Sequence, residues 1–283
     1  MSRLSGRGAV VVGGTRGIGL AVAELLAAEG AGVVLNGRDA DTARRAADGI
    51  EGAVAHPGSP SDPDVADALI DRCVDEFGSI DVLVNCAGTP GLAAESILNV
   101  SSKLFRDLID AHLMTTFETC RAAAPKMVAH GGGSIINTSS FAYLGDYGGT
   151  GYPAGKGGVN GLTLAIAAEL KEHGVRANVV CPGAKTRLST GSDYEDHIAE
   201  LNRRGLLDDV STQAALDAPP AEYAAPTYAY LAGDLAKDVT GQIFIAAGGF
   251  VGRFDRQTPA IIGFRDHNDS PPWTVEELAD LIR

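Results

Sequence analysis

The sequence lacks long apolar runs and clustered cysteines, and it is short of positive charge. No uncharged apolar stretch reaches the ~20 residues that a helix needs to cross a bilayer, and residues 1–7 show no signal-peptide core. The four cysteines, Cys73, Cys86, Cys120 and Cys181, form no Cys-x-x-Cys pair. This spacing argues against a disulfide framework or a zinc site and favours small buried thiols in a reducing compartment. We therefore expect a cytoplasmic protein without a metal.

Acidic residues outnumber basic ones by 36 to 23, which gives a formal net charge of −13. Such a surface repels phosphate backbones and anionic lipids, so we expect neither a nucleic-acid nor a membrane partner. The 283 residues, 45% of them apolar and 21% charged, fit one large globular α/β domain or at most two modest ones. Glycine is in excess, with 36 residues gathered in clusters such as 131–133 and 155–158, which predicts loops where the backbone closely approaches something else.

Short β-branched runs alternate with longer helical patterns along the chain. We expect strands at 9–13, 33–36, 53–55, 81–85, 134–138, 176–181 and 241–246, and helices at 17–29, 39–49, 62–77, 101–130 and 152–173. This alternation predicts a parallel sheet covered on both faces, in a doubly wound, Rossmann-type α/β fold. Residues 1–250 are assigned to a single catalytic domain with a polar lid at 184–222, which has a helical stretch near residues 194–204. Residues 251–283 are assigned to a C-terminal extension whose final helix begins at a capping box formed by Thr274 and Glu277. Ligands of such sheets bind beyond the carboxyl ends of the strands.

A glycine-rich turn, Gly13-Gly14-Thr15-Arg16-Gly17-Ile18-Gly19, joins the first strand to the first helix. It lets a pyrophosphate approach the helix N-terminus, although glycines alone also fit a plain tight turn. The second strand ends at Gly37-Arg38, where NAD-binding folds usually carry an acidic residue for the ribose 2′-hydroxyl. Arg16 and Arg38 suit a 2′-phosphate instead, so we expect NADP(H), with NAD(H) or a pair of solvated arginines as the alternatives.

Tyr152 and Lys156 lie four residues apart at the start of an expected helix and so share one face of it. Pro153 is typical of a first helical turn, which places Tyr152 at the helix N-terminus. The helix end and the ammonium both favour phenolate. Together with a cofactor charge, we expect them to lower the pKa of Tyr152 toward neutrality.

Six motifs follow one another along the chain. They are Gly13-x-x-x-Gly17-x-Gly19, Asn85-Cys86-Ala87-Gly88, Ser139-Ser140, Tyr152-x-x-x-Lys156, Pro182-Gly183 and Val239-Thr240-Gly241-Gln242. Their order resembles the short-chain dehydrogenase/reductase family from about residue 5 to residue 250. The resemblance implies a nicotinamide cofactor and hydride transfer between it and a carbonyl or alcohol carbon.

The resemblance also implies residue roles. Tyr152 is the general acid/base, Lys156 lowers its pKa and binds the nicotinamide ribose, and a serine polarises the substrate oxygen. The predicted catalytic residues are Ser140, Tyr152, Lys156 and His112. The predicted cofactor contacts are Gly13, Thr15, Arg16, Gly17, Ile18, Gly19, Arg38, Asn85, Ala87, Gly88, Tyr152, Lys156, Pro182 and Gly183.

The chain departs from the family pattern in several places. The family's sequence context selects Ser140, whereas its spacing to the tyrosine is met by Ser139. His112 stands where the family has an asparagine, and it is either part of a proton relay or a histidine at a helix interface. Ser59 replaces an acidic residue near adenine, and Thr186 comes early after the Pro-Gly pair.

We expect an NADP(H)-dependent oxidoreductase whose substrate is a moderately hydrophobic carbonyl or alcohol, such as a 3-oxoacyl, polyketide or steroid-like compound. The alternative is a family scaffold that binds NADP(H) in a non-redox or regulatory role. The resemblance further implies a homodimer or homotetramer packed through the helices at 101–130 and 152–173, and the extension could reach a neighbouring subunit.

Overall fold

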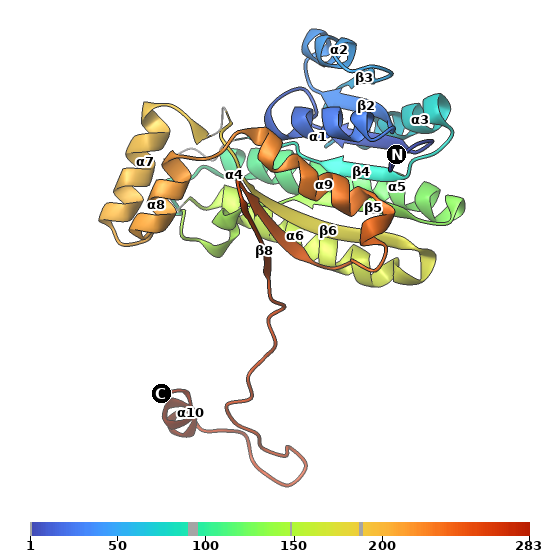
Figure 1. Cartoon of the computed structure of the whole chain (residues 1–283). Coiled ribbons are helices and arrows are strands. Elements are labelled where there is room, and N and C mark those ends of the chain that lie inside the picture. The colour runs from blue at the N-terminus through green and yellow to red at the C-terminus, as the bar shows by residue number, and fades with distance from the viewer. Residues whose placement is uncertain (1, 90–95, 148, 187–188) are drawn as a thin grey trace.

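An eight-stranded sheet runs through the middle of the molecule, in the order β3-β2-β1-β4-β5-β6-β7-β8 (Figure 1). The computed structural model describes residues 2–89, 96–147, 149–186 and 189–283. The strands are β1 Gly8–Val12, β2 Gly32–Gly37, β3 Val54–Pro57, β4 Val82–Asn85, β5 Gly133–Thr138, β6 Val175–Gly183, β7 Ile243–Ala247 and β8 Phe250–Phe254. Neighbouring strands from β3 to β7 pair in parallel, and β8 pairs antiparallel with β7.

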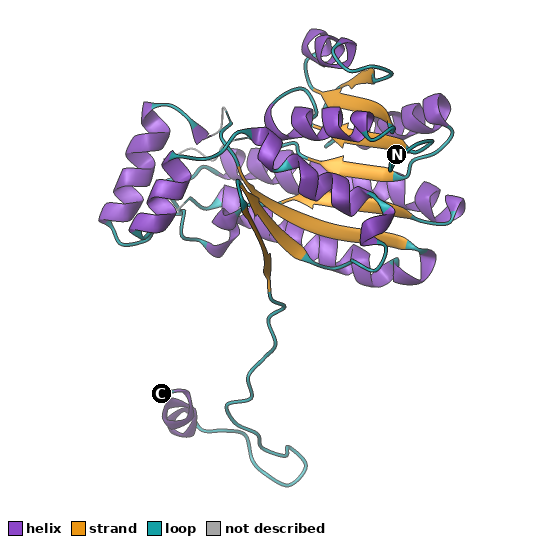
Figure 2. Ribbon diagram, viewed as in Figure 1, coloured by secondary structure: helices purple, strands orange, loops and turns teal. Residues whose placement is uncertain are grey.

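Helices cover both faces of the sheet (Figure 2). The helices are α1 Gly17–Ala28, α2 Ala40–Asp48, α3 Pro63–Phe77, α4 Ser102–Ile109, α5 Thr115–His130, α6 Gly151–Glu169, α7 Ser192–Arg203, α8 Asp209–Leu216, α9 Ala225–Ala232 and α10 Val275–Ile282. Along β1 the side chains alternate: Val11 packs in a core with α1 and α9, whereas Val10 and Val12 pack in a second core with α3 and α5. The predicted doubly wound α/β fold is confirmed.

Local signals in the sequence set where several helices begin. The side chains of Asp39, Asp62 and Ser101 accept hydrogen bonds from backbone N–H groups at the starts of α2, α3 and α4. Pro63 occupies the first turn of α3, and Gly78, at φ 83°, ends that helix in the left-handed conformation.

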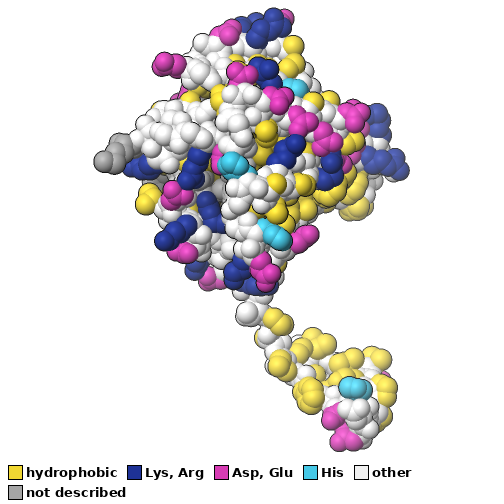
Figure 3. Space-filling model, turned by 90° about the vertical axis from the view of Figure 1, so that its right-hand side faces the viewer, with side chains coloured by type: hydrophobic (Ala, Val, Ile, Leu, Met, Phe, Trp, Pro, Cys, Tyr) yellow, Lys and Arg dark blue, Asp and Glu magenta, His cyan; other side chains and the backbone are white. Residues whose placement is uncertain are grey.

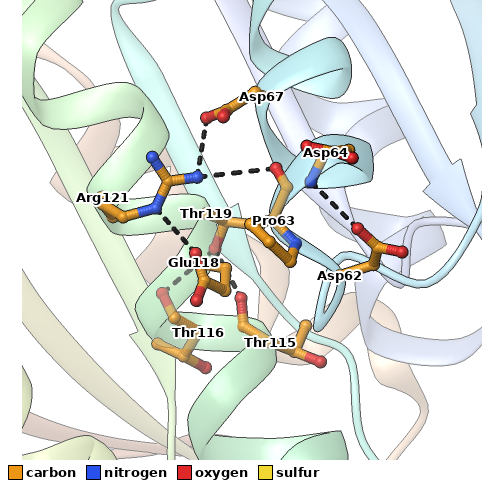
Figure 4. Close-up of polar contacts among 9 residues, drawn as sticks. All are labelled: Asp62, Pro63, Asp64, Asp67, Thr115, Thr116, Glu118, Thr119 and Arg121. Atoms are coloured by element: carbon orange, nitrogen blue, oxygen red, sulfur yellow. Dashed lines mark hydrogen bonds and ion pairs between the residues drawn. The ribbon is translucent and has the colours of Figure 1, made fainter.

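An arginine of α5 joins that helix to α3 (Figure 4). Arg121 on α5 donates from Nε to Glu118 at 2.7 Å and from Nη2 to Asp67 on α3 at 2.8 Å. The same guanidinium reaches the carbonyl oxygen of Pro63 at 3.5 Å. These contacts hold the outer side of α5, while its inner side carries groups that face the sheet.

A buried polar network fixes that inner side. Asn85 Nδ2 donates to Asn137 Oδ1 at 2.9 Å, and Thr119 Oγ1 of α5 donates to Asn85 Oδ1 at the same distance. Asn137 Nδ2 donates in turn to Thr163 Oγ1 of α6, also at 2.9 Å. Because β4, β5, α5 and α6 each contribute to it, the network locks the elements that carry the site.

Three features differ from the expected elements. The helix expected at 101–130 is divided by a π-helical turn, Asp110–Met114, between α4 and α5. The region 184–222 carries α7 where a helical stretch is expected near residues 194–204, but it also carries a second helix, α8, that was not expected; residues 187 and 188 lie outside the described part of the chain. The sheet also ends in an antiparallel strand, β8, at residues that we expected to lie at the end of the domain and the start of the extension.

Residues 255–283 project away from the three-layered body and end in α10 (Figure 1). The expected capping box is present, with Thr274 Oγ1 accepting from Glu277 N at 3.1 Å and Glu277 Oε2 accepting from Thr274 N at 2.8 Å. Hydrophobic side chains are visible along this segment (Figure 3), and Ile261 and Phe264 are 85% and 82% exposed. Over the described ranges, the model holds no helix with the length and apolarity to cross a membrane.

Candidate active site

The glycine-rich turn between β1 and α1 brings bare backbone to the carboxyl edge of the sheet. Gly13 has φ 75°, and a Cβ there would lie 2.7 Å from the backbone of Ala87 in the loop after β4. A Cβ on Gly19 would collide with the carbonyl oxygen of Gly13. Gly17 has φ 53° and lies beneath Thr186, whose methyl carbon would be 3.6 Å from a Cβ at this position. This cradle fits a pyrophosphate at the N-terminus of α1.

The end of β2 lies beside the same turn. Asn36 is buried and donates from Nδ2 to the carbonyl oxygens of His56 at 3.0 Å and Gly58 at 3.2 Å. Arg16 and Arg38 are exposed, and Arg16 is close enough to Asp39 to help lower the pKa of that carboxyl, after the dominant hydrogen bonds from Thr42. Neither arginine forms an ion pair with a described residue.

Tyr152 lies in the first turn of α6, and Lys156 one turn later, at the carboxyl ends of β5 and β6. The Ser140 hydroxyl hydrogen-bonds the Tyr152 hydroxyl. Lys156 Nζ donates to the carbonyl oxygen of Thr138 at 2.8 Å and lies 5.8 Å from the centroid of the Tyr152 ring. The structure therefore brings Ser140, Tyr152 and Lys156 together, as the motif order predicts.

The two adjacent serines point to different partners. Ser139 is buried, and its Oγ donates to the carbonyl oxygen of Lys156 at 3.1 Å. Ser140 instead meets Tyr152 and accepts at Oγ from Ala142 N at 3.2 Å. Of the two hydroxyls, that of Ser140 is the one placed beside the candidate acid/base.

The electrostatics of the site differ from our expectation. Burial raises the pKa of Tyr152 above its ordinary value, the hydrogen bond from Ser140 lowers it, and Cys181 raises it slightly. Burial also lowers the pKa of Lys156 to about 8. The Lys156 ammonium donates to the carbonyl oxygen of Thr138 rather than to the phenol oxygen. Burial therefore decides the direction in which the Tyr152 pKa moves, and Tyr152 stays protonated at neutral pH.

His112 lies in the π-helical turn and faces the same site. Its ring meets the Tyr152 ring edge-on, with centroids 4.9 Å apart and planes at 83°. Burial, followed by the charge of Lys156, lowers the pKa of His112 to about 3. Although the backbone of Thr89 lies near, neither ring nitrogen makes a well-aligned hydrogen bond within the described residues.

The remaining predicted contacts occupy the same edge of the sheet. The Asn85 side chain makes its hydrogen bonds inside the buried network, to Asn137 and Thr119. It therefore supports the loop after β4 and does not itself face a cofactor. Ala87 and Gly88 belong to that loop. Pro182 and Gly183 end β6, and a Cβ on Gly183 would lie 2.7 Å from the Cβ of Ala247, its neighbour on β7. Ile18, in the first turn of α1, packs against the core.

Two residues of the site were missed in the sequence. Thr138 supplies the acceptor for Lys156, and its Oγ1 hydrogen-bonds Tyr228 OH at 2.9 Å and Cys86 Sγ at 3.3 Å. The position of Thr138 at a strand end, just before the two serines, was a usable signal. Nothing in the local pattern of α9 marks Tyr228. Among the described residues, no group of three or more His, Cys, Asp or Glu is arranged to hold a metal ion.

Helix α7 packs against the segment that precedes α6. Ile198 and Leu201 of α7, with Leu207, form a small apolar cluster against Tyr147 and Tyr194. His197 Nε2 lies 3.0 Å from the carbonyl oxygen of Tyr147, which ties α7 to the segment before α6. A hollow of about 470 Å³ between these parts has a mixed lining: Ser96, Gly149, Asp193, Asp196, His197, Glu200, Leu201 and Arg204.

Comparison with known proteins gives a consistent result. A family model described as short chain dehydrogenase matches residues 7–195. A 3alpha-hydroxysteroid dehydrogenase of Mediterraneibacter gnavus is 35% identical over 87% of this chain and 97% of its own length. A 3-oxoacyl-acyl-carrier-protein reductase of Staphylococcus aureus is 34% identical over 86% and 97%. A crystal structure of a short chain dehydrogenase from Mycobacterium avium superposes with a TM-score of 0.80 at 31% identity, covering 99% of this chain and 95% of that one.

Proposed function

The chain belongs to the short-chain dehydrogenase family, and from this premise we propose that it interconverts a moderately hydrophobic carbonyl compound and its alcohol with NADP(H). It is an oxidoreductase of a family that binds NAD(P)(H) and acts on small carbonyl or alcohol substrates. The observation that carries the proposal is the meeting of Tyr152, Ser140 and Lys156 beside the glycine cradle.

In the reductive direction, Tyr152 gives its proton to the substrate oxygen while negative charge develops there. The Ser140 hydroxyl donates a hydrogen bond to the same oxygen and so stabilises that charge. A dinucleotide held at the glycine cradle of Gly13, Gly17 and Gly19 would supply the hydride for the carbonyl carbon. The raised pKa of Tyr152 keeps it protonated and ready to donate, and the Lys156 ammonium stabilises the phenolate that remains.

Two features support NADP(H). Arg16 and Arg38 stand exposed beside the end of β2, where guanidinium groups suit a phosphate. The acidic residue that would favour NAD(H) at this strand end is replaced by Gly37, and the Thr15 side chain occupies the space above it.

The substrate class rests on the lid and on the relatives. Tyr147, Tyr194 and the buried apolar side of α7 form an aromatic and aliphatic cluster beside the segment that precedes α6. The relatives of this chain include hydroxysteroid dehydrogenases and a 3-oxoacyl reductase. The relatives and the apolar cluster together support a 3-oxoacyl, polyketide or steroid-like compound.

The direct test is Tyr152→Phe, followed at the nicotinamide absorbance with a panel of ketones and alcohols. We expect turnover to fall by about 10²- to 10⁴-fold with NADPH binding retained, because only the transferred proton is lost. Tyr230→Phe, a partly exposed hydroxyl on α9, is the matched control and should keep wild-type turnover. Near-normal turnover by Tyr152→Phe would contradict the mechanism. Cofactor binding by the wild type without turnover of any substrate would favour a non-redox role.

We further propose a homodimer or homotetramer in a reducing, cytoplasmic setting. The four cysteines are free. On α6, Gly157 and Gly161 lie four residues apart and have open space beside them, and Phe117 of α5 is 39% exposed. These features leave a surface on α5 and α6 that a second subunit can approach closely.

A further inference from the structure

His112 occupies an unusual position in the backbone and in the site. It lies in the π-helical turn Asp110–Met114, and its side chain is only 1% exposed. Turns of this kind are rare and often mark functional sites. On α6, the contacts of Leu108 with Gly151, and of His112 with Gly155, show that this part of the chain lies directly against the turns that carry Tyr152 and Lys156.

The imidazole fills the space between the loop after β4 and α6. On one side, a Cβ on Gly88 would lie 2.8 Å from His112 Cε1 and 3.0 Å from its Nδ1. On the other side the ring meets Tyr152 edge-on, and a Cβ on Gly155 would lie 3.1 Å from His112 Cβ. The ring therefore has no room to retreat from Gly88 without pressing on Tyr152.

The ring acts in this position without a charge. Lys156 and Tyr152 from α6, and the backbone of Thr89 from the loop, are the titratable and polar groups that face it. Burial and the Lys156 ammonium lower its pKa to about 3, so it is neutral wherever the protein is assayed. A neutral ring with two unpartnered nitrogens makes no hydrogen bond to Tyr152 or Lys156 among the described residues, which leaves its shape as the means of action.

We propose that His112 is a positioning residue that couples the cofactor-facing loop, residues 86–89, to the general acid Tyr152. The inference rests on the proposed function. When the loop moves toward α6, it pushes the imidazole against the phenol ring of Tyr152. When the loop is ordered, the imidazole holds the phenol ring in place. Binding of the dinucleotide against Gly88 and alignment of Tyr152 are then one event.

A double-mutant cycle between Gly88→Ala and His112→Ala tests this coupling through NADPH affinity, measured by fluorescence titration. Gly88 has no positive φ, and its only tight neighbour among the described residues is the ring, with Lys156 Nζ at an ordinary 3.9 Å. We expect Gly88→Ala to weaken NADPH binding about tenfold in the wild-type background and less than about threefold in the His112→Ala background. Equal weakening in both backgrounds would overturn the proposal, because the methyl group would then act on the cofactor directly.

Matched controls separate the coupling from general damage. Gly249→Ala adds a methyl group in open space and should have the same small effect in both backgrounds. If His112→Ala does not fold, His112→Asn removes the outer part of the ring, including the Cε1 atom that faces Gly88, and serves in the cycle instead. Because the cycle measures binding, it remains decisive even if the wild type turns over no tested substrate, and that second result would count against the proposed function alone.

The pH profile of kcat gives a second readout. Loss of the ring in His112→Asn admits water to Tyr152 and reduces the desolvation that holds its pKa high. The limb of the profile that reports the protonated tyrosine should therefore shift to lower pH. A packing role without influence on Tyr152 would lower thermal stability and leave this limb where it is, which would overturn the proposal.

Discussion

The methyl group of Thr15 occupies the space in which a side chain on Gly37 would begin, since a Cβ built on Gly37 collides with Thr15 Cγ2. The glycine-rich turn and the end of β2 are thus fitted to one another. An aspartate at position 37, the feature that would favour NAD(H), meets the Thr15 methyl group unless one of the two side chains shifts. Room is left instead for the two exposed arginines beside it.

Cofactor preference should follow these groups. We expect Arg38→Ala to weaken NADPH binding by about 10- to 100-fold and to leave NADH binding unchanged, because a charge-assisted contact to the 2′-phosphate is lost. Arg44→Ala, an exposed arginine on α2 paired with Asp41, is the control. If Arg38→Ala weakens NADPH and NADH binding equally, Arg38 does not contact the 2′-phosphate.

The collision at Gly37 has its own test. Gly37→Asp alone should lower Tm and bind both dinucleotides poorly, because the new side chain meets the Thr15 methyl group. Thr15→Ser removes only that methyl group, so the double variant should recover Tm and gain affinity for NADH. If Gly37→Asp alone binds NADH well, the two side chains are not in conflict. Dinucleotide titration and thermal unfolding decide between these outcomes.

Substitution of Ser140 should mainly affect kcat, whereas substitution of Ser139 should mainly affect stability. Ser140→Ala removes a donor to the reacting oxygen, and we expect kcat to fall about 10²-fold with little change in Tm. Ser139→Ala removes a buried hydrogen bond to the Lys156 carbonyl, so it should lower stability by about 1 kcal/mol and affect kcat far less. A larger loss of kcat in Ser139→Ala than in Ser140→Ala would reverse the assignment.

The sheet and the site motifs could be predicted because both depend on short stretches of neighbouring residues. Val11 alternates with Val10 and Val12 between the two cores, and Asp39 and Asp62 mark helix starts through their side chains. In a parallel sheet, residues that follow the strands must gather at one edge. The carboxyl edge of the sheet is therefore where the serine pair lies close to Tyr152 and Lys156.

The rest depended on long-range packing. The π-helical turn at His112 packs closely against Gly88 and Gly155, which are distant in the sequence. The residues of the turn itself carry no pattern that predicts it. Strand β8 forms because Phe254 packs on Phe141 and Tyr143, with ring centroids 5.8 and 5.4 Å away. The raised pKa of Tyr152 could not be foreseen either, because the spacing of Tyr152 and Lys156 says nothing about burial or about Thr138 as the competing acceptor.

Removal of residues 255–283 should change assembly rather than fold. The segment has internal order: Arg265 stacks on Trp273 at 3.8 Å and donates to Glu277 at 2.8 Å. Its apolar residues, such as Ile261 and Phe264, are nevertheless exposed, and so small a unit has little core of its own. We expect the truncated protein to form a smaller oligomer or to bind substrate more weakly, as judged by light scattering and KM. No change in either would leave the extension without a role between subunits.

Lys156 should destabilise the folded protein at neutral pH, and the effect should fade in alkali. Burial lowers its pKa to about 8, whereas an unfolded chain keeps a lysine near 10.4. Between these values the unfolded state binds the extra proton, so this group's contribution to stability rises with pH, by up to about 3 kcal/mol. Below pH 8 both states are protonated and the penalty of the buried charge is complete.

The Tm of Lys156→Met minus that of wild type should therefore be largest at pH 7 and should decrease steadily toward pH 10. Buried thiols such as Cys73 and Cys120, whose pKa values burial raises to about 12, titrate alike in both proteins and cancel from the difference. Lys103→Met, an exposed lysine on α4, should differ from wild type by a constant amount over the same range. A difference for Lys156→Met that does not vary with pH would mean that the ammonium is not desolvated, and the site would then be wetter than the contacts of Lys156 with Thr138 and Tyr152 imply.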